Sequence, residues 1–420
     1  MGKKIAKWAG VALAAVLTTN MLGNGGAKAE GDSSNLFGDV QTGHWAASGI
    51  SKGVAKGYVA GYTNGTFKPD MNVTRAEFVK MVVSALNLQV GSQTDKWYAP
   101  YVASAGEQGL YKTDDFANTE TNWNKTLTRE EMARIASRAI GQKENEKEHP
   151  WMYIPEGKWM YTATKNGLMT GVGRGEIAPD GTTTRAQAVV VIERILAANA
   201  GEKLPVDKYA VSSAEVYWHG TNIFTVMPEV FYAPEKWIGS NGKNESADFW
   251  NEKKMTVKSR DGLYEGKLDT LIAIDLADPN DPNLKLLPPI KELKWDNNVG
   301  NQNINDLPVS KQMNSYILYY KTRTISNKRP EVYSTHFPPH FQISGFDSPN
   351  RDDFYKKGIL NTITRVYHKE PFDTTAWILP KKGYVRSSSI SIGVRTPTAG
   401  NYGYLVSDIL EFSYPQSTGE

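Results

Sequence analysis

The chain carries one motif three times, as Thr74–Arg75–Ala76–Glu77, Thr128–Arg129–Glu130–Glu131 and Thr184–Arg185–Ala186–Gln187. The copies begin 54 and 56 residues apart, and apolar residues follow each threonine at offsets of 4, 7, 8, 11 and 12. This spacing places the apolar side chains on one face of a helix. The threonine and the Glu or Gln three residues later can also cap the helix reciprocally. The motifs therefore predict three capped helices within an internal repeat.

Helix capping does not explain the arginine of each motif. Arg75, Arg129 and Arg185 occupy the first helical position, where the helix dipole disfavours an exposed cation by about 0.3–1 kcal/mol. One explanation is that each arginine pairs with a nearby carboxylate. The other is that the guanidinium group and the free amides of the helix N-terminus together bind a carboxylate or phosphate ligand. The sequence leaves both interpretations open.

A shorter predicted helix and a connector precede each motif, and the connector is rich in glycine in the first and third copies. The first connector contains Gly61 and the turn dipeptide Asn64–Gly65, and the third keeps Gly171 at the matching distance from its threonine. The second copy has a longer connector without these glycines. Trp45 and Trp97 lie near the starts of the first two short helices, either as core residues or as flat surfaces for a sugar ring.

Residues from about 35 to 197 resemble three consecutive S-layer homology repeats. Besides the three arginine motifs, the resemblance rests on Phe37-x-Asp39–Val40, His44–Trp45–Ala46 and Gly61–Tyr62-x-Asn64–Gly65–Thr66–Phe67. It implies an all-α fold in which the repeats form a pseudo-threefold helical trimer with grooves between neighbours. The second copy matches weakly outside its final helix.

The resemblance also implies a ligand. Repeats of this family bind the secondary cell wall polymer of Gram-positive bacteria non-covalently, commonly through a terminal pyruvylated N-acetylmannosamine. The carboxylate of a pyruvate ketal would suit an arginine beside an aromatic ring. The resemblance therefore assigns polymer binding to Arg75, Arg129, Arg185, Asp39, Trp45, Gly61 and Gly171.

The N-terminal segment has the pattern of a secretory signal peptide. Lys3, Lys4 and Lys7 precede an apolar run at 8–17, and Ala27–Lys28–Ala29 supplies a cleavage pattern. The 420 residues carry a formal charge of +3, and removal of the signal would leave −1, which gives no support for nucleic-acid binding. No later apolar run approaches the length of a membrane helix, so no transmembrane segment is expected, and the chain has no cysteine.

The residues after 205 change in character. Alternating β-branched and aromatic runs such as 271–274, 316–320 and 388–394 are separated by turn residues, which predicts a mostly-β, antiparallel sandwich-like domain of no recognised family. The expected divisions are a signal peptide at 1–29, repeats at 30–88, 89–141 and 150–197, a linker at 198–205, and a β-rich surface domain at 206–420.

This second half shows no motif for a serine nucleophile, a zinc protease or a phosphate-binding loop. Prolines between His336 and His340 forbid a helical metal pair, and residues 296–300 lack the positions of a calcium loop. No catalytic or metal residue is assigned, and no cofactor is expected, with calcium as the alternative. A carboxylate pair for glycoside hydrolysis would be invisible in a single sequence.

Two functional hypotheses follow. The first is an exported cell-surface protein of a Gram-positive bacterium, anchored to pyruvylated wall polymer and displaying a β-rich domain, with self-association in an S-layer lattice. The alternative is a polysaccharide-binding or glycan-degrading enzyme on the same anchor. The lack of a nucleophile or metal motif favours the first. Enzymatic activity is left open, and the sequence favours a protein without it.

Overall fold

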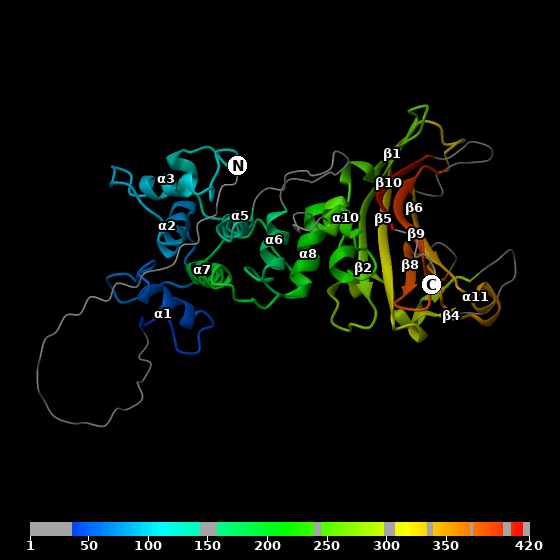
Figure 1. Cartoon of the computed structure of the whole chain (residues 1–420), viewed down its shortest axis with the longest axis horizontal. Helices are drawn as coiled ribbons and strands as arrows, with labels where there is room; N and C mark the ends of the chain where they lie inside the picture. The colour runs from blue at the N-terminus through cyan, green and yellow to red at the C-terminus, as the bar shows by residue number, and fades with distance from the viewer. Residues whose placement is uncertain are drawn as a thin grey trace, which may run out of the picture.

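The computed structural model describes residues 36–142, 158–238, 245–297, 307–333, 339–369, 373–397 and 405–414. A helical part and a sheet-rich part lie side by side along the longest axis of the molecule (Figure 1). The predicted signal peptide at 1–29 lies outside the described residues. No helix among the described residues is long and apolar enough to cross a bilayer.

The three motif helices form as predicted, and each begins at its arginine. The helices of this part are α1 (Ala47–Ala55), α2 (Arg75–Ala85), α3 (Ala99–Glu107), α4 (Glu120–Trp123), α5 (Arg129–Ala139), α6 (Trp159–Lys165) and α7 (Arg185–Asn199). A complete capping box precedes α2, α5 and α7. In the first, the amide of Glu77 donates to Thr74 Oγ1 at 3.2 Å, and the amide of Thr74 donates to Glu77 Oε2 at 2.7 Å. The capping prediction is confirmed.

Replacing Thr74 by Ala is expected to lower the free energy of unfolding by about 0.5–2 kcal/mol, because the amide of Glu77 loses its acceptor. Thr74→Ser keeps the hydroxyl and should retain most of the stability. Denaturant unfolding followed by circular dichroism measures both variants. Equal losses in the Ser and Ala variants would assign the effect to the lost methyl group instead of the cap.

The segments before α2, α5 and α7 are joined in a closed ring of backbone hydrogen bonds. The amide of Val73 donates to the carbonyl of Thr183 at 3.0 Å, that of Thr183 to Leu127 at 3.0 Å, and that of Leu127 to Val73 at 2.9 Å. Isolated antiparallel bridges accompany this ring. Each motif helix also packs against a short helix from the next copy: α2 against α3, α5 against α6, and α7 against α1.

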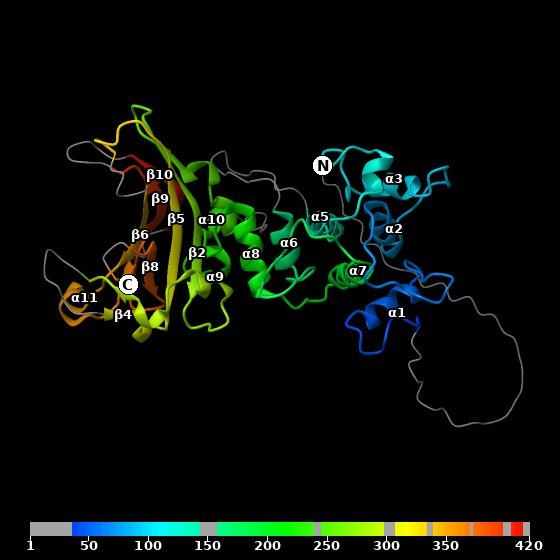
Figure 2. The ribbon, with the colours of Figure 1, turned by 180° about the vertical axis from the view of Figure 1, so that it is seen from behind.

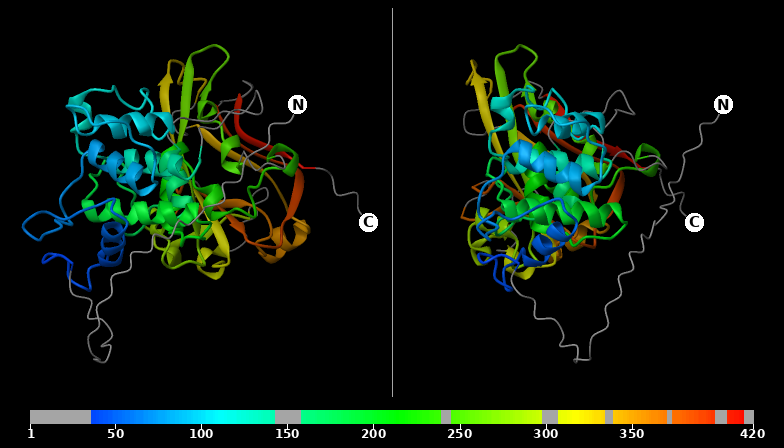
Figure 3. Two further views of the ribbon diagram at one scale, coloured as in Figure 1. Left: turned by 60° about the vertical axis from the view of Figure 1, so that its left-hand side comes forward. Right: turned by 90° about the vertical axis from the view of Figure 1, so that its left-hand side faces the viewer.

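The sheet-rich part contains two antiparallel sheets among the described residues. The larger runs in the order β1 (Thr256–Lys258), β2 (Tyr264–Asp275), β5 (Ser315–Asn327), β8 (Ala376–Pro380), β7 (Thr364–Tyr367), β3 (Lys294–Trp295) and β4 (Leu307–Pro308). The smaller runs in the order β10 (Val406–Ser413), β9 (Val385–Arg395) and β6 (His340–Asp347). The turn between β1 and β2 projects beyond the rest of the sheet (Figure 3).

Helices also belong to this part. They are α8 (Lys208–His219), α9 (Ile223–Val226), α10 (Glu235–Ile238) and α11 (Arg351–Lys357), with the 3₁₀ turns η1 (Ser246–Phe249), η2 (Glu252–Met255), η3 (Pro282–Leu286), η4 (Ile290–Glu292) and η5 (Val309–Lys311). Asp207 begins α8 by accepting from the amides of Tyr209 and Ala210, and Gly220 ends it with φ of 78°.

The predicted fold class, an all-α pseudo-threefold trimer followed by a mostly-β domain, is wrong. The chain is a mixed α/β multidomain protein. Extended segments that bridge one another join the helices of the first part. Three helices, α8 to α10, come before the first strand of the second part. The strand prediction for 206–420 rested on its β-branched runs and overlooked the capping residue Asp207, which starts a helix directly after the predicted linker.

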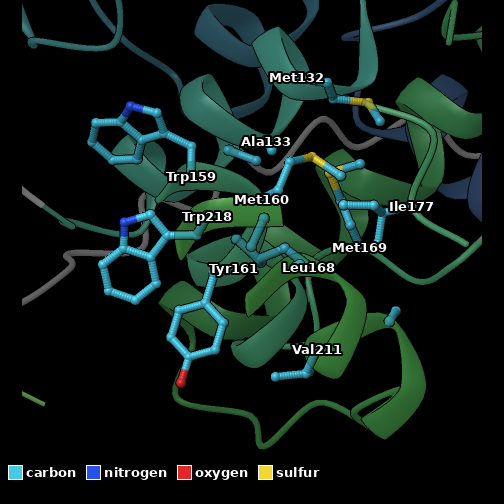
Figure 4. Packing of buried hydrophobic residues seen from close by; sticks show 14 of the residues in the cluster. Met132, Ala133, Trp159, Met160, Tyr161, Leu168, Met169, Ile177, Val211 and Trp218 are labelled. Atoms are coloured by element: carbon cyan, nitrogen blue, oxygen red, sulfur yellow. The ribbon is translucent and has the colours of Figure 1, made fainter. Parts of the chain in front are cut away.

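Helix α8 connects the two parts. It packs against α6 on one side and lies near α9 and β2 on the other, and the view from behind places both α6 and α8 between the motif helices and the sheets (Figure 2). The ring of Tyr161 on α6 stacks against Trp218 on α8, with centroids 5.2 Å apart (Figure 4). The division of the chain into the predicted domains stays a prediction, and this contact is continuous with the main buried core.

Candidate functional site

Each motif arginine reaches into the connector of another copy. Arg75 donates to the carbonyl of Asn122 at 3.0 Å. Arg129 donates to the carbonyls of Ile177 and Thr170 at 2.8 and 2.7 Å. Arg185 donates to those of Phe67 and Ala60, both at 2.9 Å. All three guanidinium groups therefore hold backbone carbonyls in place across a boundary between copies.

Arg75 differs from the other two because it has a carboxylate partner. Its Nη2 forms an ion pair with Glu131, and both side chains are largely buried. The ring of Phe116 covers the guanidinium group at 4.3 Å from its centroid. Its Nε is buried without a hydrogen-bond partner among the described residues. These contacts favour the ion-pair explanation for Arg75.

Arg129 and Arg185 have no carboxylate in hydrogen-bond contact among the described residues. Their hydrogen bonds use Nε and Nη2, and both bonds go to neutral carbonyl groups. In each, Nη1 has no hydrogen-bond partner in the described part of the chain and is not among its buried unsatisfied atoms. A charged donor that reaches solvent from a rigidly held guanidinium group is suited to binding an anion.

Arg185 has aromatic and cationic neighbours from the first connector. The guanidinium carbon lies 5.1 Å from the centroid of the Tyr62 ring and 4.6 Å from that of Phe67. Lys68 Nζ lies 4.4 Å from the centroid of Tyr62, and Lys68 is exposed. We call Arg185, Tyr62 and Lys68 the Arg185 cluster. It combines two cations with a half-buried ring, which suits a sugar that carries a carboxylate.

Asp39 positions this cluster through the backbone. Its carboxylate oxygens accept from the amides of Phe67 and Lys68, both at 2.7 Å. Lys68 has φ of 56°, a conformation that is costly for a residue with a side chain, and these hydrogen bonds help to maintain it. Burial acts to raise the pKa of Asp39, but the two amide hydrogen bonds and the charge of Arg185 hold that pKa below its usual value.

Gly61 and Gly171 have structural reasons for lacking a side chain. A Cβ at Gly61 would lie 2.0 Å from the ring of Phe37, and one at Gly171 would lie 3.0 Å from the carbonyl oxygen of Glu176. Trp45 is 62% exposed, and its ring stacks on that of His44 with centroids 5.5 Å apart. No hydrogen bond or ring contact in the described part of the chain joins Trp45 to a motif arginine.

The structure thus gathers some of the predicted residues and separates others. Asp39 positions the connector that holds the Arg185 cluster, whereas Arg75 and Arg129 lie at other boundaries between copies. Tyr62 and Lys68 were missed as site residues, although both lie within the connector pattern that indicates the repeat. Arg129 has Ile177 where Arg185 has Phe67, and burial lowers the pKa of its guanidinium group.

Three grooves in the described part of the chain have no motif arginine in their lining. Grooves of 940 and 590 Å³ in the helical part are lined by other residues, the second by α1 and α7. A groove of 270 Å³ lies among α8, η3, β2 and β5. The described residues contain no group of three His, Cys, Asp or Glu side chains that could hold a metal ion.

The model of the S-layer homology domain family matches residues 36–79 and 147–189. The predicted middle repeat at 89–141 is not matched. Three similar proteins, each 28% identical, are the amylopullulanase of Thermoanaerobacterium thermosulfurigenes, exoglucanase XynX of Acetivibrio thermocellus and the surface-layer 125 kDa protein of Lysinibacillus sphaericus. The matches cover 38, 38 and 36% of this chain but only 9, 16 and 14% of those relatives. Two segments of the chain, at 36–79 and 147–189, are therefore S-layer homology domains.

Proposed function

We propose that the chain is a cell-surface protein held non-covalently to an acidic polymer of the Gram-positive cell wall through its helical part. The observation that carries this proposal is the Arg185 cluster, where a guanidinium group that donates to no carboxylate among the described residues lies beside Tyr62 and Lys68. The two S-layer homology domains support a location at the cell surface.

The chemistry of the cluster selects the class of polymer. A glycan unit with a pyruvate ketal has one carboxylate, which Arg185 Nη1 and Lys68 can approach, and a sugar face that can lie against Tyr62. Arg129 offers a guanidinium group beside Ile177 in place of an aromatic ring, and Arg75 is occupied by Glu131. We infer that the boundary at Arg185 binds most strongly, that at Arg129 more weakly, and that at Arg75 least.

The full chain is expected to sediment with purified cell walls and to stay in the supernatant when the walls have been stripped of secondary polymer. Co-sedimentation followed by gel densitometry measures the bound fraction. Added free polymer should compete, and pyruvate-free polymer should not. Raising the salt should weaken binding only moderately, because the guanidinium group is mostly buried. Equal retention by stripped walls would contradict the polymer assignment.

The second candidate is an anchored protein that binds or degrades polysaccharide, and it is favoured by the names of two relatives, an amylopullulanase and an exoglucanase. The sheet-rich part would then act on glycan, instead of assembling with its own copies in a lattice. Release of reducing sugar from amorphous cellulose, xylan or pullulan would support it.

Analytical ultracentrifugation of the full chain tests the lattice role. The expected result is assembly that increases with protein concentration.

A further inference from the structure

The groove of 590 Å³ between α1 and α7 contains an arginine with free donors. Arg194 lines this groove, and its Nη1 donates to the carbonyl of Leu168 at 3.4 Å. Its Nε and Nη2 have no hydrogen-bond partner among the described residues. Neither atom is among the buried unsatisfied atoms, so both reach solvent. The guanidinium group is therefore held by the protein on one side and open on the other.

Arg138 is the counterpart of Arg194 in the second copy. Both lie ten residues after the threonine of their motif, and both donate to the carbonyl of the leucine that follows a glycine after a short helix. Arg138 also forms an ion pair with Asp115, in which Nη1 donates to Oδ2, and Nη2 donates to Oδ1 at 3.0 Å. A guanidinium group in this position can therefore hold a carboxylate through two of its nitrogens.

The third copy offers no such carboxylate to Arg194. Residues 168–175 of its connector contain no acidic residue, and no carboxylate among the described residues accepts from Arg194. Arg134, which also donates to Asp115 at 3.0 Å, is matched by Val190, because both lie six residues after the threonine of their motif. Val190 lines the groove. The place that a carboxylate occupies in the second copy is therefore open to solvent in the third.

The aromatic ring that covers Arg138 is also missing beside Arg194. Trp159 on α6 lies over the guanidinium group of Arg138, with its ring centroid 5.0 Å from Cζ. Gly49 on α1 is at the matching position, since each residue lies eight positions before the glycine that follows its helix. Gly49 lines the groove. The groove therefore has room for a ring where the contact between α5 and α6 has the indole of Trp159.

The charges of the groove favour an anion. Lys52 and Lys56 line it together with Arg194. Of the two acidic residues in the lining, Glu193 accepts from Lys56 Nζ at 2.9 Å, so its charge is paired, and Glu202 is exposed to solvent. The cations of the lining therefore outnumber its acids.

We propose that the groove between α1 and α7 binds a sugar acid, that is, a pyranose ring that carries a carboxylate. The carboxylate would lie beside Arg194 as that of Asp115 lies beside Arg138, and the ring would lie against Gly49. The volume of 590 Å³ falls within the range of about 300–1,000 Å³ that is usual for small-molecule sites. The groove shares no residue with the Arg185 cluster, so this inference does not rest on the proposed function.

Two probes place the carboxylate differently on the ring. They are methyl glucuronide and the 4,6-pyruvylated methyl glycoside of N-acetylmannosamine, which distinguish a uronic acid from a pyruvate ketal as the source of the carboxylate. Saturation-transfer NMR of each probe with the full chain measures its dissociation constant. At least one acidic probe should bind, and methyl glucoside, which has no carboxylate, should not. Binding should persist in Arg185→Ala, which removes the other candidate site.

Two substitutions test the groove itself. Arg194→Gln should weaken binding of the acidic probe by about ten- to a hundredfold, because the hydrogen bonds to a charged group are lost. Gly49→Trp should abolish binding by filling the groove with a ring. A Cβ at Gly49 would meet its nearest neighbour at 3.5 Å, which is an ordinary contact. Gly49→Ala is the matched control and should bind as the wild type does, with no loss of thermal stability, because alanine favours a helix more than glycine does.

Three results would overturn the proposal. They are binding of neither acidic probe, equal affinity in the wild type and Arg194→Gln, and loss of binding in Arg185→Ala but not in Arg194→Gln, which would place the probe in the Arg185 cluster. Unchanged affinity in a folded Gly49→Trp chain would contradict the proposal as well. If Gly49→Trp does not fold, the comparison of Arg194→Gln with Arg185→Ala decides the question.

Discussion

Arg185→Ala is expected to lower the affinity of the chain for pyruvylated wall polymer by about ten- to a hundredfold. A hydrogen bond to a charged group contributes about 1.5–3 kcal/mol, and each 1.4 kcal/mol corresponds to a tenfold change in affinity. Arg185 is the motif arginine whose guanidinium group lies beside both Tyr62 and Phe67 and donates to no carboxylate among the described residues. Isothermal titration with purified polymer measures the effect.

Arg75→Ala is the matched control, because it removes the same side chain from the same position of another motif. It should leave polymer affinity within about twofold of wild type but lower the melting temperature, since Glu131 loses its ion-pair partner. Arg185→Ala also loses two hydrogen bonds to backbone carbonyls, so both variants must be compared below their melting temperatures. Arg185→Lys keeps the positive charge but lacks the two-pronged guanidinium group that can donate two parallel hydrogen bonds, so it should bind the polymer with intermediate affinity. A larger loss of binding in Arg75→Ala than in Arg185→Ala would place the polymer elsewhere.

Short-range features of this chain could be predicted from its sequence. The capping boxes span four residues, so their partners are fixed by local geometry alone. The contacts of the motif arginines could not be predicted from the neighbouring sequence. Arg75 meets Glu131 from the next motif, whereas Arg185 meets carbonyls more than a hundred residues earlier. The three motifs look alike in sequence, and only the contacts across copies distinguish an occupied guanidinium group from one that can bind an anion.

The junction between the two parts shows a second limit. Asp207 and the apolar pattern after it could have indicated α8, but the small residues and proline before it suggested a domain boundary. The importance of α8 comes from its partners, since Trp218 stacks on Tyr161 and Glu215 caps α9 from within the core. No local pattern reveals that a glutamate will be fully buried.

Lys158→Met is expected to lower the free energy of unfolding by about 3–5 kcal/mol, because breaking a buried ion pair on one side leaves an uncompensated charge. Lys158 precedes α6 and Asp248 lies on η1, so their 2.8 Å ion pair joins the helical part to the sheet-rich part. The carboxylate of Asp248 is 0% exposed, and the ammonium group of Lys158 lies 5.1 Å from the centroid of the Trp218 ring.

The double variant Lys158→Met, Asp248→Asn separates loss of the charge pair from loss of packing. It should recover most of the lost stability, because the oxygen of the introduced carboxamide can still accept from the amide of Glu245, as the carboxylate of Asp248 does at 2.8 Å.

Burial raises the pKa of Asp248, and removal of Lys158 should raise that pKa further. A carboxyl whose pKa is raised on folding destabilises the fold most at high pH, so the deficit of Lys158→Met should be greater at pH 7 than at pH 4. Thermal or denaturant unfolding at both pH values measures it. A loss that does not depend on pH and that the Asn substitution does not rescue would show that Lys158 contributes through its contact with Trp218 and not through its charge.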